Sequence, residues 1–264
     1  MEVRVVDAPK HERGPDTLAP LLGKRFYTKN GIYLQVVEGY ARPDDAVWYA
    51  LHQCYSPEFS MDDPLPKDPG GSIVRNLLNK SHFGPLEHPT LTVNIGGVSR
   101  ALMAQLTRHR TGITFDIQSL RYTKLLDLKV DEESFVIPPY LKEGATPKVR
   151  ERFVGSKEIV DPDRAREIFL KGYERDLQEY KELIELGVPA EDARYKLPEG
   201  LKIFMVMSAN VRTFLHLLDM RLPPNAQWEI RELCELFLHV GELWMPKTFQ
   251  WYRENRAYKH RLAP

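Results

Sequence analysis

The stretch LTRHRTGITFDIQSLRYT at residues 106–123 gathers side chains that can bind an anion. Arg108, Arg110 and Arg121 are permanently charged, and His109 becomes charged when it is protonated. An arginine guanidinium is a flat fork that binds phosphate oxygens, or a carbonyl beside a ring nitrogen, through two hydrogen bonds. The stretch therefore predicts a locally assembled site for an anionic ligand.

Three further arginines, Arg194, Arg212 and Arg221, lie in helical patterns further along the chain. A single charged side chain is more often a solvated surface residue than a ligand, whereas a cluster of several favours a site. Arg221 falls in the last helical turn before Pro223-Pro224, where the helix dipole also favours a cation. That structural role explains Arg221 as well as a functional role does.

Histidines accompany these arginines. His82 and His88 bracket the stretch HFGPLEH, and His216 lies in the later helical pattern that also carries arginine. HFGPLEH does not match the H-E-x-x-H pattern of zinc enzymes, and Pro85 interrupts any helix there, so no metal site is predicted. A hydrogen-bonded structural role is the alternative for each histidine, and it is weaker for His109 because of its neighbours.

The chain has few candidate nucleophiles. Cys54 and Cys234 lie in no C-x-x-C or metal-ligand spacing, and Cys234 occupies an apolar helical register typical of the core. Ser119 lacks the G-x-S-x-G context of a hydrolase nucleophile. The glycine-rich phosphate cradles G-x-G-x-x-G and G-x-x-x-x-G-K-[ST] are also absent from the sequence. If a nucleotide binds, side chains must hold its phosphates.

The charges of the whole chain cancel, with 37 Lys and Arg against 37 Asp and Glu. A nucleic-acid-binding module is an alternative use for the arginines, but such modules usually carry a basic face, so we expect no nucleic acid partner. The sequence has no apolar run of the roughly 18 residues that span a bilayer, and its start lacks a signal-peptide hydrophobic region. We expect a soluble, cytoplasmic, disulfide-free protein with no membrane partner.

The helices and strands around these residues are predicted from hydrophobic periodicity and from helix-start, helix-stop and turn signals. Ser99 is the expected N-cap of the helix that runs into the R-H-R stretch. In the first half of the chain we expect an irregular lead-in at 1–31, a strand at 32–40, a helix at 46–55, a loop at 61–71, a helix at 72–82, a strand at 90–97 and a helix at 100–110.

The second half is mostly helical in pattern. Phe169, Tyr173, Leu177, Tyr180 and Ile184 form a core-facing stripe at spacings of three and four. We expect extended segments at 119–130 and 133–141, helices at 161–187 and 189–196, an apolar run at 201–210, helices at 211–220, 225–242 and 244–255, and a basic tail at 253–264. The fold class is therefore α+β with more helix than strand, in a single domain over 1–264.

The motif resembles the R-H-R-x(7,8)-S signature of the flavin-dependent thymidylate synthases, with eight residues before Ser119. HFGPLEH upstream, and VPAEDARYKLP, NVRTFLHLLDMR and NAQWEI downstream, continue the resemblance in the family's order over roughly residues 70–250. It implies the family's fold, a central antiparallel or mixed sheet with long helices packed on it. It also implies a homotetramer with active sites shared between subunits.

The resemblance implies that the chain makes thymidylate (dTMP) from deoxyuridylate (dUMP). Methylenetetrahydrofolate would donate the carbon, FAD would carry the hydride, and NADPH would be the usual reductant. Both FAD and dUMP carry phosphates, and the folate carries carboxylates. An arginine-rich pocket without a glycine-rich loop can bind these anionic groups. An FAD-binding oxidoreductase with a different substrate is the remaining alternative.

The family's functional residues are carried over by matching positions. Gly84 stands where other members have a hydroxyl residue, and the eight-residue spacing leaves open whether Asp116, Ile117 or Gln118 replaces a polar ligand; we favour Gln118. The expected FAD-binding residues are His82, Gly84, Glu87, Arg108, His109, Arg110, Asn210, Arg212 and His216. The expected dUMP-binding residues are Gln105, Arg108, Gln118, Ser119, Leu120, Arg121, Arg194 and Arg221, with Arg121 and Arg194 on the phosphate.

Arg221 matches the family's arginine against the uracil ring and is the expected catalytic residue. Its charge would stabilise negative charge that develops along the N3 and carbonyl edge of uracil, and this makes C5 more electron-rich. Such polarisation can replace the attack of a cysteine on the ring, for which neither cysteine lies in a suitable motif. Ser119 is expected to position the substrate and not to attack it.

Overall fold

The computed structural model describes residues 11–123, 125–145 and 161–259. Their centre is a five-stranded sheet in which every neighbouring pair is antiparallel, in the order β1-β2-β3-β5-β4. Its strands are β1 (Arg25–Tyr27), β2 (Tyr33–Gly39), β3 (Thr90–Ser99), β4 (Ile113–Ile117) and β5 (Lys202–Asn210). The sheet together with the helices confirms the expected α+β class.

The register gives the sheet one apolar and one polar face, because side chains of a strand alternate between faces. Two rows of cross-strand partners run through all five strands. The row on the face that we call the core face consists of Phe26, Leu34, Ile95, Met205 and Ile117. The row on the opposite face, which we call the open face, consists of Arg25, Gln35, Asn94, Val206 and Asp116.

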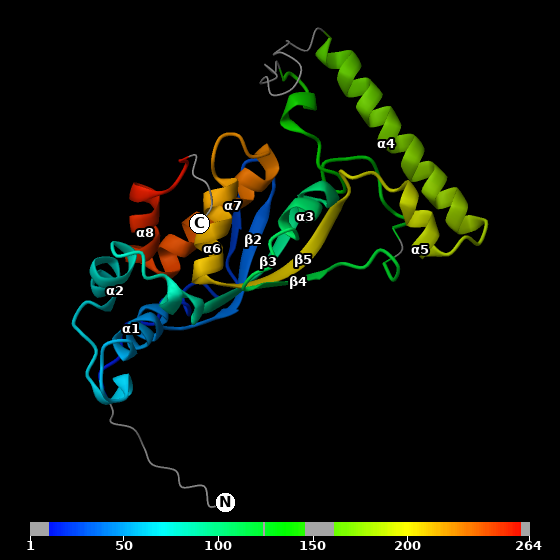
Figure 1. Cartoon of the computed structure of the whole chain (residues 1–264). Coiled ribbons are helices and arrows are strands. Elements are labelled where there is room, and N and C mark those ends of the chain that lie inside the picture. Colours follow the sequence, from blue (N-terminus) through cyan, green and yellow to red (C-terminus); the bar gives the residue numbers. More distant parts are fainter. Residues whose placement is uncertain (1–10, 124, 146–160, 260–264) are drawn as a thin grey trace, which may run out of the picture.

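The helices gather at two places around this sheet. Figure 1 shows α6, α7 and α8 together on one side of it and α4 and α5 at its far end. The helices are α1 (Pro43–Gln53), α2 (Pro69–Ile73), α3 (Arg100–Leu106), α4 (Pro162–Glu185), α5 (Ala190–Ala193), α6 (Val211–Arg221), α7 (Trp228–Trp244) and α8 (Pro246–Asn255). Short 3-10 turns lie at Ser60–Asp62, Gly84–Glu87, Pro139–Leu141 and Arg194–Lys196.

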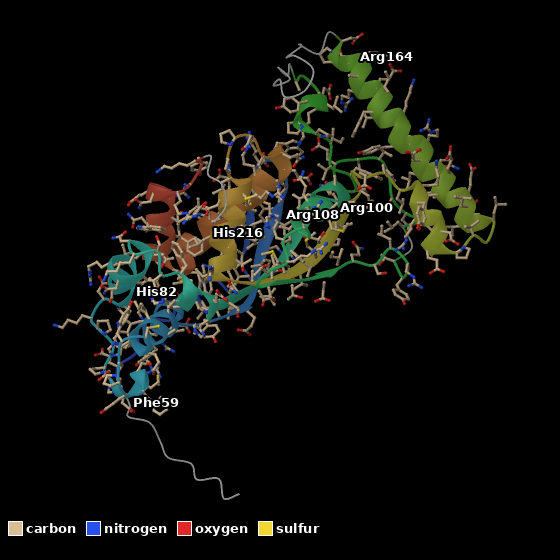
Figure 2. The ribbon with its side chains drawn as sticks, in the orientation of Figure 1. Phe59, His82, Arg100, Arg108, Arg164 and His216 are labelled. Atoms are coloured by element: carbon tan, nitrogen blue, oxygen red, sulfur yellow. The ribbon has the colours of Figure 1, made fainter. Side chains whose placement is uncertain are left out.

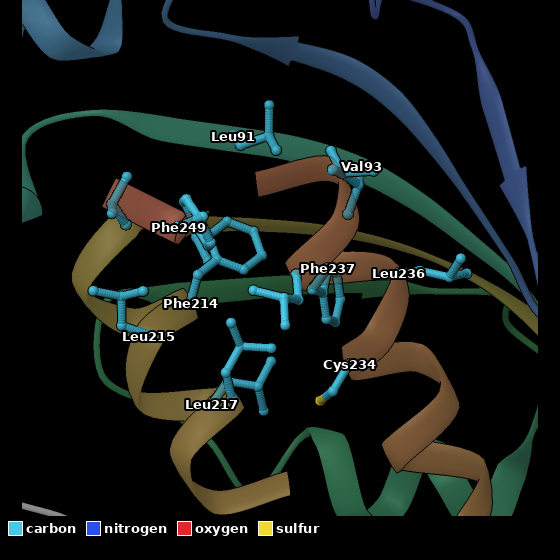
Figure 3. Close-up of a cluster of buried hydrophobic side chains, with 14 of the residues drawn as sticks. Leu91, Val93, Phe214, Leu215, Leu217, Cys234, Leu236, Phe237 and Phe249 are labelled. Carbon is cyan, nitrogen blue, oxygen red and sulfur yellow. The ribbon is translucent and has the colours of Figure 1, made fainter. Parts of the chain in front are cut away.

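The main hydrophobic core lies between the core face and α6 and α7. Phe214 and Leu217 of α6 and Phe237 of α7 pack there with Leu91 and Val93 of β3 (Figure 3). Burying a side chain of this size stabilises the fold by about 1.5–3 kcal/mol. The core therefore fixes α6, which carries several of the expected site residues, against the sheet.

A second hydrophobic cluster forms around α4. Leu177 and Tyr180 of the expected α4 stripe are buried in it, while Tyr173 and Ile184 pack at its edge. Leu120 and the short helices after α4 complete it, so the cluster holds the segment that follows β4. The single-domain organisation stays a prediction.

Two strands were missing from the sequence-based expectations. β1 lies within the stretch 1–31 that was expected to be irregular, and β4, at 113–117, follows the R-H-R motif, where no element was expected. Both are short edge strands, which are stabilised by pairing with β2 and β5 more than by their own sequences. Residues 1–10 of the expected lead-in lie outside the described residues.

Several expected boundaries were also wrong. The helix expected at 100–110 ends at Leu106, and the one expected at 72–82 is α2 continued by a π-helical turn at Val74–Leu78. The described part of 119–130 and 133–141 contains no named strand, only a 3-10 turn and one bridge between Phe135 and Leu201. In the expected tail at 253–264, α8 continues to Asn255, and residues 260–264 lie outside the described residues.

Candidate functional site

The R-H-R motif lies in an irregular turn that follows the end of α3. The Ser99 hydroxyl accepts the Leu102 N–H at 3.0 Å and caps α3, as expected. Beyond the helix, Arg108 and Arg110 are exposed, and neither forms an ion pair with any described carboxylate. Figure 2 shows Arg108 near α3 and His216 near α6. The two arginines are therefore free to bind an external anion.

The two residues after the motif are bound to the start of α6. The Thr213 hydroxyl donates to the Thr111 carbonyl at 2.8 Å, and the Asn210 N–H donates to the Gly112 carbonyl at 3.2 Å. Gly112 has a φ of 66°, and a Cβ there would lie 2.4 Å from the Thr213 hydroxyl, so only glycine fits. Asn210 also caps α6 by accepting the Thr213 N–H at 2.8 Å.

His109 meets Arg221 from the far end of α6. The Arg221 Nε–H donates to His109 Nε2 at 3.1 Å, and the ring of His216 lies edge-on to His109 with 6.0 Å between centroids. Burial, together with the charges of Arg221 and His216, lowers the pKa of His109 to about 4. His109 is therefore neutral at physiological pH.

Glu87 and Arg212, both expected at the FAD site, form an ion pair between the turn Gly84–Glu87 and the first turn of α6. Each side chain is about half exposed, at 52% and 54%, so the pair contributes little to stability. Gly84 is exposed, and a Cβ added there meets no atom within 4 Å. A hydroxyl residue, as other family members have, would fit at this position.

Two expected ligand-binding side chains carry buried polar atoms without partners. His82 Nδ1 and Gln105 Oε1 are both inaccessible and make no hydrogen bond. Leaving such an atom unpaired costs about 1–3 kcal/mol, and a ligand group is one way to satisfy it. His82 was expected to contact FAD and Gln105 to contact dUMP, so both orphaned atoms coincide with expected ligand positions.

The expected phosphate ligands Arg121 and Arg194 both contact Glu191. Arg121 forms a 2.7 Å ion pair with the Glu191 carboxylate, and Arg194 Nε donates to the Glu191 carbonyl at 3.0 Å. The Ser119 hydroxyl accepts the Arg121 N–H at 3.4 Å. Leu120 is buried in the second hydrophobic cluster, so it can contact a ligand only through its main chain.

Of the three residues left open before Ser119, two lie on the open face. Asp116 belongs to the polar cross-strand row, while Ile117 belongs to the core-face row. Gln118 continues the pairing through its N–H to the Phe204 carbonyl at 2.9 Å. All three line a hollow of about 420 Å³ on the sheet, together with Arg25, Tyr33, Gln35, Asn94, Ile95, Phe204, Met205 and Val206.

The described contacts join the expected residues into separate groups. One contains His109, His216 and Arg221, another Glu87 and Arg212, and a third Arg121 and Arg194. Within the described residues, no hydrogen bond or ion pair connects Arg221 with Arg121 or Arg194. The described contacts therefore link these residues within three small clusters and do not link the clusters to one another.

The cysteines lie where a nucleophile is not expected. Cys234 is fully buried in the main core, and burial raises the pKa of its thiol far above the ordinary value. Cys54 is exposed at the end of α1, and its thiol donates to the Ala50 carbonyl. These placements agree with a mechanism that uses no thiol.

Two buried carboxylates beside the site were not among the residues expected from the sequence. Glu229 of α7 is buried and holds Ser99 at the start of α3. Asp219 of α6 is buried and forms an ion pair with Arg256, whose guanidinium also lies 5.6 Å from the centre of the Phe83 ring. A carboxylate within an apolar helical register, as at both acidic positions, is the sequence signal that could have identified them.

None of the helices among the described residues combines the length and the apolar character that a membrane span requires.

Residues 35–247 match the family model described as thymidylate synthase complementing protein. The flavin-dependent thymidylate synthase of Haloarcula marismortui is 42% identical over 197 residues, covering 73% of this chain and 79% of that protein. The flavin-dependent thymidylate synthase of Halobacterium salinarum is 34% identical over 246 residues, covering 88% and 99%.

The fold also resembles a solved structure. The crystal structure of the UMP/dUMP methylase PolB from Streptomyces cacaoi, bound with 5-Br dUMP, superposes with a TM-score of 0.71 at 23% identity, covering 90% of this chain and all of that one. This likeness shows the shared fold, and the sequence matches show the relationship. The chain therefore belongs to the flavin-dependent thymidylate synthase family.

Proposed function

We propose that the chain catalyses the reductive methylation of dUMP to dTMP, with methylenetetrahydrofolate as carbon donor, FAD as hydride carrier and NADPH as reductant. The family to which the chain belongs supports this reaction class. The cytoplasm is the expected location of the protein. The observation that carries the residue assignment is the joining of the R-H-R segment to both ends of α6. Thr213, at the start of α6, bonds the Thr111 carbonyl that follows the motif, and Arg221, at the end of α6, bonds His109 within it.

The residues present fit FAD. Arg108 and Arg110 are exposed and without a carboxylate partner, and Arg212 is held only by an exposed ion pair, so all three can bind phosphate. The unpartnered His82 Nδ1 offers a further polar contact. When bound, FAD would supply hydride transfer, which no side chain can perform. Gly84, Glu87, His109, Asn210 and His216 complete the proposed flavin site.

The proposed dUMP site uses two kinds of contact. Arg121 and Arg194 bind the phosphate, for which Arg121 exchanges its ion pair with Glu191 for the ligand. Ser119, the main chain at Leu120 and the unpartnered Gln105 Oε1 orient the nucleoside. Gln118 and Arg108 are the remaining proposed ligands.

Arg221 is the proposed catalytic residue. Its guanidinium binds the N3 and carbonyl edge of uracil and stabilises the negative charge that develops there as C5 becomes nucleophilic. A developing charge that meets a prepositioned cation in a desolvated site is stabilised by several kcal/mol. The buried thiol of Cys234 takes no part.

A homotetramer with shared active sites accounts for the separation of the proposed ligands. Asp116 lies on the open face of the sheet, and Gln118 lines the same hollow, while Arg221 ends a helix that packs on the core face. The open face also carries exposed aromatic side chains, including Phe204 at 56%. A second copy that covers this face would exclude water and bring another chain's ligands to the site.

The experiment that tests the function starts from purified protein. Heat releases the bound cofactor, whose absorbance spectrum identifies the flavin, and an anaerobic assay measures dTMP formed from dUMP, methylenetetrahydrofolate and NADPH. Leaving out each component in turn, and replacing NADPH by NADH, assigns the co-substrates. A colourless protein that forms no dTMP, or a trapped covalent adduct between uracil and a cysteine, would contradict the proposal.

A further inference from the structure

The contact between His109 and Arg221 fixes the protonation of the histidine without ambiguity. Arginine has only donors and is always charged, so the 3.1 Å contact requires His109 Nε2 to accept the Arg221 Nε–H. A neutral imidazole whose Nε2 is an acceptor carries its proton on Nδ1. The geometry therefore defines both the charge and the tautomer of His109.

The surroundings of His109 maintain this neutral form. Its ring is half-buried, Arg221 approaches from the end of α6, and His216 approaches edge-on from the preceding turns of the same helix. Burial and the two cationic or potentially cationic neighbours all lower the pKa of His109, to about 4. Protonation would place two positive groups at hydrogen-bond distance and would break the contact.

A neutral partner has a particular consequence for Arg221. A carboxylate would compensate the guanidinium charge, whereas the imidazole orients the group and leaves its full positive charge available. Only Nε is engaged, and among the described residues no hydrogen bond or ion pair is made by the two terminal nitrogens of Arg221. These two nitrogens remain free for the two-pronged contact that a uracil edge offers.

We propose that His109 is a positioning residue that acts as a neutral hydrogen-bond acceptor and aims the Arg221 guanidinium at the substrate ring. The role is separate from any contact of His109 with flavin, and it rests on the proposed function in so far as Arg221 binds uracil. Protonation of His109 would release Arg221, so the orientation is lost only in acid. His216 contributes by its position against the ring of His109.

The first test uses matched variants of the flavin-loaded protein. Glutamine can place an acceptor oxygen near the position of Nε2, whereas leucine cannot, so His109→Leu lowers kcat for dTMP formation by roughly 10- to 100-fold and His109→Gln restores most of it. The bound flavin per chain is measured for each variant. The control is His239→Leu, the same change at an exposed histidine of α7, which leaves kcat and flavin content unchanged.

The second test does not depend on turnover. Nitrogen-15 spectra of labelled histidine in the flavin-loaded protein are expected to show His109 protonated at Nδ1 and neutral above its lowered pKa of about 4. In the Arg221→Met variant, which lacks the donor and the charge, the pKa of His109 should rise toward 6.5. If His109→Leu cannot be purified with flavin, this comparison still decides the question.

The outcomes separate this inference from the proposed function. A wild-type His109 that titrates near 6.5, or that carries its proton on Nε2, overturns the positioning role whether or not the protein forms dTMP. Equal kcat in His109→Leu and wild type, or equal losses in His109→Leu and His109→Gln with full flavin content, also overturns it. A protein with the expected tautomer that forms no dTMP contradicts the proposed function and leaves the contact between His109 and Arg221 intact.

Discussion

Glu229 holds Ser99 through both of its carboxylate oxygens. Oε1 accepts the Ser99 N–H at 2.6 Å, and Oε2 accepts the Ser99 hydroxyl at 2.7 Å. Both residues are almost fully buried, at 2% exposure each. Because Ser99 begins α3 and Glu229 lies in the first turn of α7, the contact fixes the helix that leads into the R-H-R motif against the segment that follows Arg221.

Glu229→Ala should lower the free energy of unfolding by about 3 kcal/mol, because it leaves two buried donors of Ser99 unpaired. Denaturant-induced unfolding measures the change. Glu182→Ala, on the exposed surface of α4, is the control and should change stability by less than about 0.5 kcal/mol. Equal effects of the two substitutions would show that the buried contact contributes nothing.

The ion pair between Asp219 and Arg256 should be much more important than those on the surface, because Asp219 is buried. Arg256→Met leaves the Asp219 carboxylate without its partner and should cost about 3–5 kcal/mol in unfolding free energy. The second substitution Asp219→Asn, made in the same chain, should recover part of that loss. Arg164→Met breaks the exposed pair with Glu167 and should cost less than about 1 kcal/mol.

Arg212→Ala should weaken FAD binding by roughly 10- to 100-fold, the range for the loss of one charged hydrogen bond. The ratio of flavin to protein absorbance after gel filtration measures the retained cofactor. Lys247→Ala breaks an ion pair of comparable exposure with Asp68 and serves as the matched control. Full flavin content in Arg212→Ala would remove this residue from the proposed site.

Arg221→Lys should retain FAD and lose at least about 100-fold in kcat at saturating dUMP, because a point charge cannot follow the uracil edge as a guanidinium does. The ammonium also has no Nε–H with which to meet His109. Steady-state rates and the flavin spectrum of the same preparation are compared. An unchanged kcat would contradict the catalytic role of Arg221.

The pH dependence of stability should include a contribution from Asp44. Burial raises its pKa from 3.8 to about 6, and the neighbouring carboxylates of Asp45 and Asp68 act in the same direction. A raised pKa means that the unfolded chain ionises first, so the contribution of Asp44 is fully present below pH 3.8 and is lost as the pH rises through about 6.

Asp44→Asn should therefore gain stability relative to wild type by about 2–3 kcal/mol between pH 4 and pH 7, as the pKa shift implies. Unfolding curves of both proteins at several pH values give the difference directly. Asp127→Asn, at an exposed loop position, should keep a constant difference from wild type. A constant difference for Asp44→Asn as well would contradict the raised pKa.

Much of the local structure could be predicted from the residues alone, and the candidate site residues were proposed from them. Ser99 was expected to cap the helix that follows it and does so, because a polar side chain at that position bonds the N–H three residues later. The strand around residues 90–99 and the long helix at 162–185 follow from periodicity, whereas the expected apolar run at 201–210 became a strand only through its pairing with β3 and β4. The order of the R-H-R motif and its companion segments was sufficient to identify the family.

Which of these residues contact one another depends on the long-range packing of the chain. His109 and Arg221 are 112 residues apart, and Ser99 and Glu229 are 130 apart, so no local pattern relates them. The register of β4 on β5 likewise decided that Asp116 faces the open side and Ile117 the core. A period of two fixes alternation within a strand, but the choice of face depends on the partner strand and on the helices that cover it, and these are long-range packing effects.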